Sequence, residues 1–238
     1  MAIPTTGIVF LFGAFIYFYL SRRFWNYYKA ENNRIAKLFA LAFFLLAMGF
    51  IVPSVFSLFL IENRVIWWII CPIYEGLISL GGLVIAYTVA SVRFPKYLPF
   101  YIALISIALI IYVILLVIYP PFYSYINGSL NWELEKPLII GGMSFLGLGL
   151  LILVPAAIVF FQEVKRAKEK KIKIRSIGLG LTMIWMLLVI IVDFFLLNIF
   201  KLPPVYSDLN WFTSFLLLAI TLLLTWGSPR PKWVKKVE

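Results

Sequence analysis

Two acidic residues inside long apolar runs carry the chemistry that this sequence has to explain. Glu75 lies in CPIYEGLISLGG, and Asp193 lies in MLLVIIVDFFLLN. An ionised acid at the middle of a bilayer costs roughly 2.5–3.5 kcal/mol on insertion scales, so such residues normally face the interior of a helix bundle or a wet cavity. There, an acid can bind a cation, exchange a proton or hydrogen-bond to another helix.

Small and polar residues accompany the two acids. Cys71, Glu75 and Ser79 recur at helical spacing and form one small or polar stripe. Pro72 removes a backbone hydrogen bond near Glu75, and Pro53 does the same in the preceding apolar run, so both predict helix kinks. We expect an outward-facing polar pocket that binds a ligand or a proton. Its predicted residues are Glu75, Asp193, Ser54, Ser57, Cys71, Ser79, Asn198, Thr213 and Ser214.

A structural interpretation of the same residues stays open beside the pocket. A protonated Glu75 or Asp193 can donate to a backbone carbonyl that a proline has freed, and then serves only to hold two helices together. Cys71 fits a small core residue as well as a pocket residue. The residue types alone do not separate these two interpretations.

The elements that must position the acids are transmembrane helices. The chain is 63% hydrophobic and 13% charged, whereas soluble domains are about half apolar. About 20 residues cross the apolar slab of a membrane as a helix. We therefore predict an all-α membrane protein, a single domain over 1–238 with a bundle of seven transmembrane helices. The spans are expected at about 3–20, 38–61, 65–91, 98–119, 138–162, 177–200 and 210–227.

Basic residues set the predicted orientation. All but three of the 21 basic residues fall on one side of the predicted spans, the exceptions being Arg64, Lys136 and Lys201. By the positive-inside rule, the N-terminus lies outside and the C-terminus inside a multi-pass cell-membrane protein. The net charge of +11 then reflects topology and attraction to membrane lipids, and we expect no nucleic-acid partner.

One basic loop is a candidate docking segment for a cytosolic or membrane protein partner. The alternative is a solvated loop whose charges only fix the topology. Its Lys- and Glu-rich composition, KRAKEKKIKIR, is also typical of archaeal hyperthermophile proteins. The predicted docking residues are Lys165, Arg166, Lys168, Lys170, Lys171, Lys173 and Arg175.

Several chemistries lack their residues. The chain has no histidine and one cysteine, which excludes histidine-ligated haem or metal centres, cysteine-based zinc sites and an internal disulfide. No HExxH, GxSxG or phosphate-binding loop motif occurs, and the last span has no lysine for a retinal Schiff base. We predict no catalytic residues, no metal, no cofactor and no enzymatic activity.

Two segments resemble a known family. They are YLSRRFWNYYKAENNRIAKLFALAFFLLAMGF and LPPVYSDLNWFTSFLLLAITLLLTWGSPRP. In their pattern of residue types they are similar to the start and end of the seven-helix sensor region that precedes some bacterial and archaeal histidine kinases. That family continues into an output domain, whereas this chain stops soon after its last span. The resemblance implies a sensor module whose output runs through a partner, and no catalytic residue carries over.

Three functions follow from these observations. The first is a receptor or sensor, in which a small ligand from the outer side meets Glu75 and Asp193 and the basic loop passes the signal to a partner. The second is a structural subunit of a larger membrane complex. The third is a transporter of a small solute coupled to a proton or cation, for which buried acids and broken helices are the usual devices.

Overall fold

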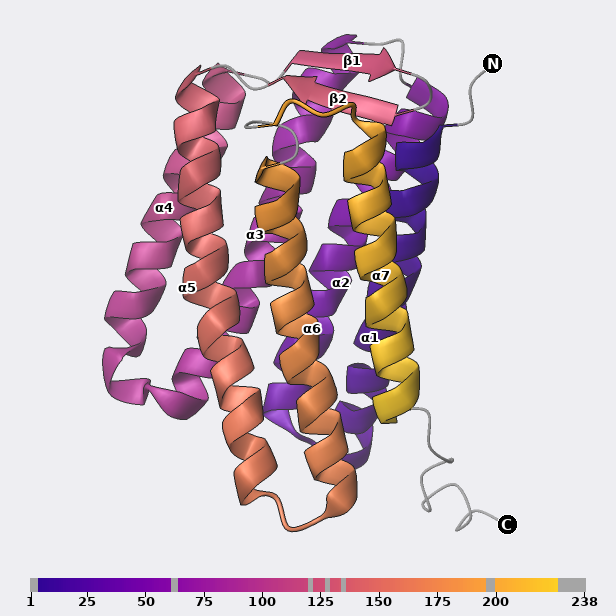
Figure 1. The fold of residues 1–238 in the computed structure, drawn as a ribbon. Helices are drawn as coiled ribbons and strands as arrows, with labels where there is room; N and C mark the ends of the chain where they lie inside the picture. The colour runs from indigo at the N-terminus through magenta and orange to yellow at the C-terminus, as the bar shows by residue number, and fades with distance from the viewer. Residues whose placement is uncertain are drawn as a thin grey trace.

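The fold of the chain is a bundle of long antiparallel helices with a small β-hairpin across one end (Figure 1). It is seen in a computed structural model, which describes residues 4–60, 64–119, 122–126, 129–133, 136–195 and 200–226. The prediction of an all-α protein is confirmed apart from the hairpin, which the sequence analysis treated as a loop. Within the described residues, six helices are long and apolar enough to cross a membrane: α1, α2, α3, α4, α6 and α7.

The helices follow the apolar runs. The first four are α1 (Thr5–Glu31), α2 (Arg34–Val55), α3 (Arg64–Arg93) and α4 (Leu98–Ile118). The remaining three are α5 (Lys136–Arg166), α6 (Lys170–Phe194) and α7 (Val205–Trp226). A π-helical turn, η1 (Phe56–Leu60), continues α2, and a 3-10 turn, η2 (Pro95–Tyr97), precedes α4. Helix α5 contains the predicted span 138–162, and its side chains are described only in part.

Neighbouring helices form a closed ring. Helix α1 packs against both α2 and α7, and the ring continues from α2 through α3, α5 and α6 to α7. Helix α4 lies outside this ring against α3 and α5. Successive helices alternate in direction, so the starts of α1, α3, α5 and α7 share the end that carries the hairpin (Figure 1). We call this the hairpin end, and we call the opposite end, with the α1–α2 turn and the α5–α6 loop, the basic end.

The turn between α1 and α2 is shorter than predicted. Asn32 ends α1 in the left-handed conformation, with φ of 49°, and its N–H bonds to the Tyr28 carbonyl at 2.7 Å. Asn33 begins α2, because its side chain accepts from the backbone N–H groups of Ile35 and Ala36. The expected loop after a span ending near residue 20 is therefore wrong, because the helix runs to Glu31 before the paired asparagines reverse the chain.

The hairpin is made of β1 (Phe122–Ile126) and β2 (Ser129–Glu133), which pair antiparallel with Phe122 opposite Glu133 and Ile126 opposite Ser129. Two short segments rich in Tyr, Ile and Trp around an Asn-Gly pair are a recognised hairpin pattern. The sequence analysis searched for spans of about 20 residues, and strands of five residues escape such a search.

Aromatic side chains fill the centre of the ring between α1, α2 and α7. The Tyr17 and Phe50 rings stack with centroids 5.5 Å apart, and Phe50 meets Phe215 edge-on at 5.2 Å. Trp211 packs against Phe10 at 5.7 Å. A second apolar cluster lies toward the hairpin end, where Trp67 is fully buried against Phe56 and packs with Leu130 of the hairpin; its buried members are Phe56, Trp67, Cys71, Tyr74, Tyr112, Leu116 and Leu130.

The prolines sit inside helices, as predicted. Pro53 lies within α2 and is followed by the π-helical turn η1, a local change of helix type that fits a lost backbone hydrogen bond. Pro72 lies within α3. The bends themselves stay predictions. Close helix approach comes from glycine instead: a Cβ at Gly49 would stand 2.7 Å from Ile78 of α3, so α2 and α3 could not approach as they do with a larger residue there.

Candidate functional site

The most developed polar site is a set of hydroxyl groups around Asp208 at the hairpin end. Thr6 donates to both carboxylate oxygens of Asp208, at 2.8 and 2.9 Å, and Thr5 donates to one of them at 2.7 Å. The Ser129 hydroxyl lies 3.0 Å from that of Thr5 and also bonds to Asp208. We call Thr5, Thr6, Ser129 and Asp208 the Asp208 cluster. It joins α1, the hairpin and α7 through side chains that are about 200 residues apart.

Local sequence places each member of the cluster. Pro203 and Pro204 precede α7, and the Asp208 N–H bonds to the Pro204 carbonyl at 3.1 Å, which fixes Asp208 in the first turn of the helix. An acid in that position also meets the positive end of the helix dipole. Thr6 accepts from the Leu130 N–H at 2.8 Å and thereby holds β2 against the start of α1. The result is a carboxylate that is only 6% exposed and that several O–H donors surround.

The predicted acid Asp193 lies beside this cluster. It is next to the last residue of α6, and Ser207 of α7 donates to its carboxylate. Trp211 and Asn210 are further hydrogen-bond partners from α7, and Asn210 also donates to the Val189 carbonyl of α6 at 3.1 Å. Asp193 and Asp208 are close enough to interact electrostatically.

Two carboxylates of like charge on adjacent helices favour a cation or a shared proton between them. The Asp208 cluster supplies carboxylate and hydroxyl oxygens, which are the donors that hard cations and protonated amines accept. Within the part of the chain that the structure describes, no group of three or more His, Cys, Asp or Glu residues is close enough to hold a metal ion. The arrangement therefore suits recognition of a small polar or cationic group rather than a polycarboxylate metal centre.

Glu75 occupies a different environment. Tyr74 donates a hydrogen bond to its carboxylate, and Cys71 and Tyr112 are its other electrostatic neighbours. Cys71, Tyr74 and Tyr112 belong to the second apolar cluster between α3 and α4. From the start of α3 at Arg64, Glu75 lies about 16 Å along the helix, at 1.5 Å per residue.

The two predicted acids thus have no neighbour in common among the contacts described. Asp193 sits at the hairpin end of α6 and bonds to α7, whereas Glu75 sits more than two turns inside α3 and faces aromatic residues. The estimate of similar depth placed Asp193 several residues inside a span that was expected to end at 200; the helix ends at Phe194. A cavity shared by Glu75 and Asp193 stays a prediction.

The small polar residues near Glu75 are buried. The Ser54 hydroxyl donates to the Phe50 carbonyl of its own helix at 2.7 Å. The hydroxyls of Ser57 and Ser79 are buried without a hydrogen-bond partner in the described structure. Cys71 is also buried and has a free thiol. These four residues are enclosed by helix packing.

The predicted residues from the last two spans divide. Thr213 is exposed, and its hydroxyl donates to the Leu209 carbonyl of its own helix at 2.7 Å. Ser214 is half-buried on α7. Asn198 lies outside the described residues. Neither described residue is a member of the Asp208 cluster.

The predicted docking residues gather around the α5–α6 loop at the basic end (Figure 1). Lys171 falls among residues whose side chains are not described, and Arg175 is half-buried. The exposed members are Lys165, Arg166, Lys168, Lys170 and Lys173. Their accessibility agrees with both interpretations, a docking segment and a solvated loop.

Sequence reasoning missed Asp208, Thr5, Thr6, Ser129 and Ser207. A usable signal was present, because an alternating topology puts the starts of the first and last spans and the loop between the fourth and fifth on the same side. Asp208 after Pro203-Pro204 and the hydroxyl pair after Pro4 then lie on one surface. The search for acids inside apolar runs passed over an acid at the edge of one.

Comparisons of the chain with family models, with curated proteins and with solved structures find no match. The resemblance to the sensor region of histidine kinases therefore stays a prediction.

Proposed function

We propose that the protein is an integral membrane receptor or sensor module with seven spans, its N-terminus outside and its C-terminus inside. It recognises a small polar or cationic group at the hairpin end and signals through a partner at the basic end. One observation supports this most directly. The Asp208 cluster ties the hairpin to the first and last helices, and the hairpin leads straight into α5.

Two helices connect the proposed sensing end to the proposed output end. Helix α5 begins after β2 and ends at Arg166, and α6 begins at Lys170 and ends beside Asp193. The short loop between them carries the exposed cations at the basic end. A ligand that draws Asp193 or Asp208 away from its hydroxyl donors changes the contacts of α6 and α7 at one end, and a rigid helix transmits that displacement to the loop.

Transport is the second candidate, because two acids on adjacent helices suit coupling to a proton or cation. The core beside these acids counts against it. Trp211 bonds to Asp193 and is itself packed against Phe10, and Tyr17, Phe50 and Phe215 fill the centre of the ring. A transported ion needs polar groups along its path, whereas these side chains are aromatic.

A reporter on the α5–α6 loop tests the sensor proposal. Ala167→Cys in a Cys71→Ser background carries an environment-sensitive fluorophore, and the protein is reconstituted in liposomes with the inner buffer held constant. External Na⁺, Ca²⁺ and tetramethylammonium are added as probes. At least one probe is expected to change the fluorescence, and Asp208→Asn is expected to abolish that change. The matched control is Thr225→Val, which removes a hydroxyl bonded only to its own helix at 2.6 Å.

Two outcomes contradict the proposal. An unchanged response in Asp208→Asn removes the Asp208 cluster from sensing. Uptake of a probe cation that is lost in Asp193→Asn makes the protein a transporter. Labelling of Lys168→Cys from one side of intact cells and Ile126→Cys from the other checks the orientation, because Lys168 and Ile126 are exposed at opposite ends of the bundle.

A further inference from the structure

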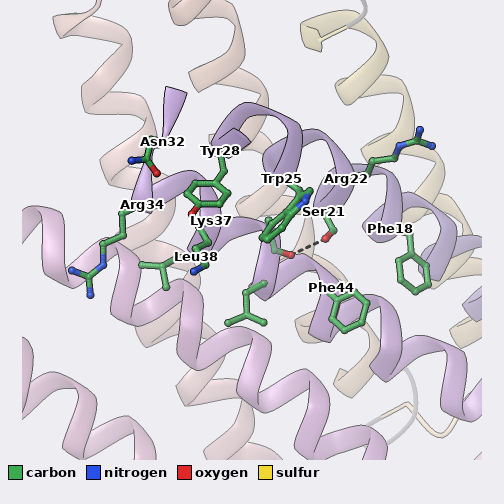
Figure 2. Close-up of a pocket in the computed structure, with 12 residues that line it drawn as sticks. Phe18, Ser21, Arg22, Trp25, Tyr28, Asn32, Arg34, Lys37, Leu38 and Phe44 are labelled. Carbon is green, nitrogen blue, oxygen red and sulfur yellow. Dashed lines mark hydrogen bonds between the residues drawn. The ribbon is translucent and has the colours of Figure 1, made fainter. Parts of the chain in front are cut away.

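A second site lies at the basic end, in a groove between the last turns of α1 and the first turns of α2. The groove has a volume of about 940 Å³, which falls within the usual range of pockets for small molecules and cofactors. Its floor is held together by Ser21, which donates to the Ala40 carbonyl at 2.8 Å (Figure 2). We call it the basic groove.

Charge in the basic groove has one sign. Arg22, Arg34 and Lys37 are among the lining residues, and none of the 12 residues that line it is acidic. The Lys37 ammonium lies 5.6 Å from the centre of the Tyr28 ring, which holds it beside the groove. Such a set attracts an anion and provides no carboxylate to repel one.

The lining changes character along its length. Figure 2 shows Asn32, Arg34 and Lys37 toward one side, and the Phe18 and Phe44 rings at the other. Phe18 and Phe44 pack edge-on, with centroids 5.8 Å apart. Arg34 opens α2, and Phe44 lies about 15 Å further along it at 1.5 Å per residue, which carries the groove from the helix end into the apolar part of the bundle.

We propose that the basic groove binds one anionic phospholipid, with its phosphate at Arg34 and Lys37 and an acyl chain along Leu41 and Phe44. The cations match a headgroup that carries net negative charge, and the exposed Leu41 and Phe44 face where lipid chains are present. Trp25 and Tyr28 lie between the two parts, which is where amphipathic rings sit at a membrane interface. The site is separate from the Asp208 cluster and does not rest on the sensor proposal.

Titration in mild detergent with native mass spectrometry measures the binding. Phosphatidylglycerol is the anionic probe, phosphatidylcholine with the same acyl chains is the neutral one, and glycerol 1-phosphate is the headgroup without chains. The wild-type protein is expected to bind one phosphatidylglycerol at least about tenfold more tightly than phosphatidylcholine. Glycerol 1-phosphate is expected not to displace it at equal concentration, because the acyl contacts are missing.

Matched variants locate the site. Arg34→Gln with Lys37→Gln is expected to weaken phosphatidylglycerol binding about tenfold or more, whereas Lys165→Gln with Lys168→Gln removes the same charge from the same end and is expected to change it less than twofold. Leu41→Trp fills the groove without changing charge, and is expected to weaken binding by a similar factor. Thermal unfolding of each variant near the wild-type temperature shows that the fold is intact.

Three results would overturn the proposal. Equal losses in the two double variants would mean non-specific attraction of lipid to the whole basic end. Unchanged binding in Leu41→Trp would place the lipid elsewhere. Displacement by glycerol 1-phosphate at equal concentration would make the groove a site for a free phosphate compound.

Discussion

The two ends of the bundle treat charge in opposite ways. At the hairpin end, Asp208 and Asp193 are held by hydroxyl groups from neighbouring elements, and Asp208 is almost fully enclosed. At the basic end, Arg34, Lys37 and the cations of the α5–α6 loop are exposed around an open groove. A buried charge has to be satisfied by fixed partners, whereas an exposed one remains solvated and free to meet a ligand.

The difference teaches where stability and binding reside. Each hydrogen bond to a charged group contributes about 1.5–3 kcal/mol, while an exposed charge contributes about 0–1 kcal/mol. The hairpin end is therefore expected to be sensitive to single substitutions in its polar residues. The basic end is expected to tolerate loss of charge and to depend for stability on packing.

The strongest way to break the comparison is Asp208→Ala. The change leaves the Thr5 and Thr6 hydroxyls without their acceptor and removes three hydrogen bonds to one carboxylate. We expect the free energy of unfolding, measured by denaturant titration in mixed micelles, to fall by about 3 kcal/mol. Asp208→Asn keeps one acceptor oxygen and is expected to lose less. A change below about 0.5 kcal/mol for Asp208→Ala would show that the hairpin end does not depend on its carboxylate.

Gly178→Val tests the claim that packing holds the basic end. A Cβ at Gly178 would stand 2.7 Å from the Cβ of Thr225, so a larger side chain forces α6 away from α7. Overpacking of this kind is expected to cost about 2 kcal/mol in the same titration. Gly76→Ala is the control, because a Cβ there meets nothing within 4 Å. Equal effects at Gly178 and Gly76 would contradict the packing explanation.

Thr6→Val sharpens the comparison at the hairpin itself. Valine keeps the shape of threonine but loses the hydroxyl that donates to Asp208 and accepts from the Leu130 N–H. We expect a loss of about 1 kcal/mol and faster hydrogen exchange at the Leu130 amide. The matched control is Thr213→Val, an exposed threonine whose hydroxyl bonds only to its own helix. Unchanged exchange at Leu130 would mean that the strands alone hold the hairpin.

The smallest effect is expected from Lys165→Gln with Lys168→Gln. Both side chains are exposed in the basic end, so the free energy of unfolding is expected to change by no more than about 0.5 kcal/mol. Binding of a protein partner to the α5–α6 loop, measured by co-purification from native membranes, is expected to weaken with the same two changes. A stability loss above about 1 kcal/mol would show that the basic end is not merely solvated.

Much of the helical architecture follows from the sequence because apolar run length is a strong signal. The run around Glu75 became α3, and Pro53 and Pro72 fell inside helices as expected. Helix ends were less accessible, since hydropathy marks the apolar slab and not the last hydrogen bond. Helix α1 runs to Glu31, because the asparagine pair that stops it is polar and lies well beyond the apolar run.

The candidate site was less predictable for a different reason. Thr6 and Asp208 are 202 positions apart, so no spacing rule connects them. Asp193 stood out because it interrupts an apolar run, but its bond from Ser207 depends on where α6 ends and α7 begins. The hairpin that places Ser129 and Leu130 is too short to have a hydropathy signature. Each of these contacts comes from tertiary structure, which periodicity along one helix does not contain.

The closure of the ring has a consequence for how the molecule is made. Helix α1 packs against α7, and Thr5 and Thr6 find their acceptor only in Asp208 near the start of that helix. A ribosome releases α1 early, while the chain that will carry Asp208 is still untranslated. The contacts between the two helices therefore form only after α7 has entered the membrane. The same two threonines that fix the hairpin end in the finished protein are, during biosynthesis, the part of α1 that waits longest for its partner.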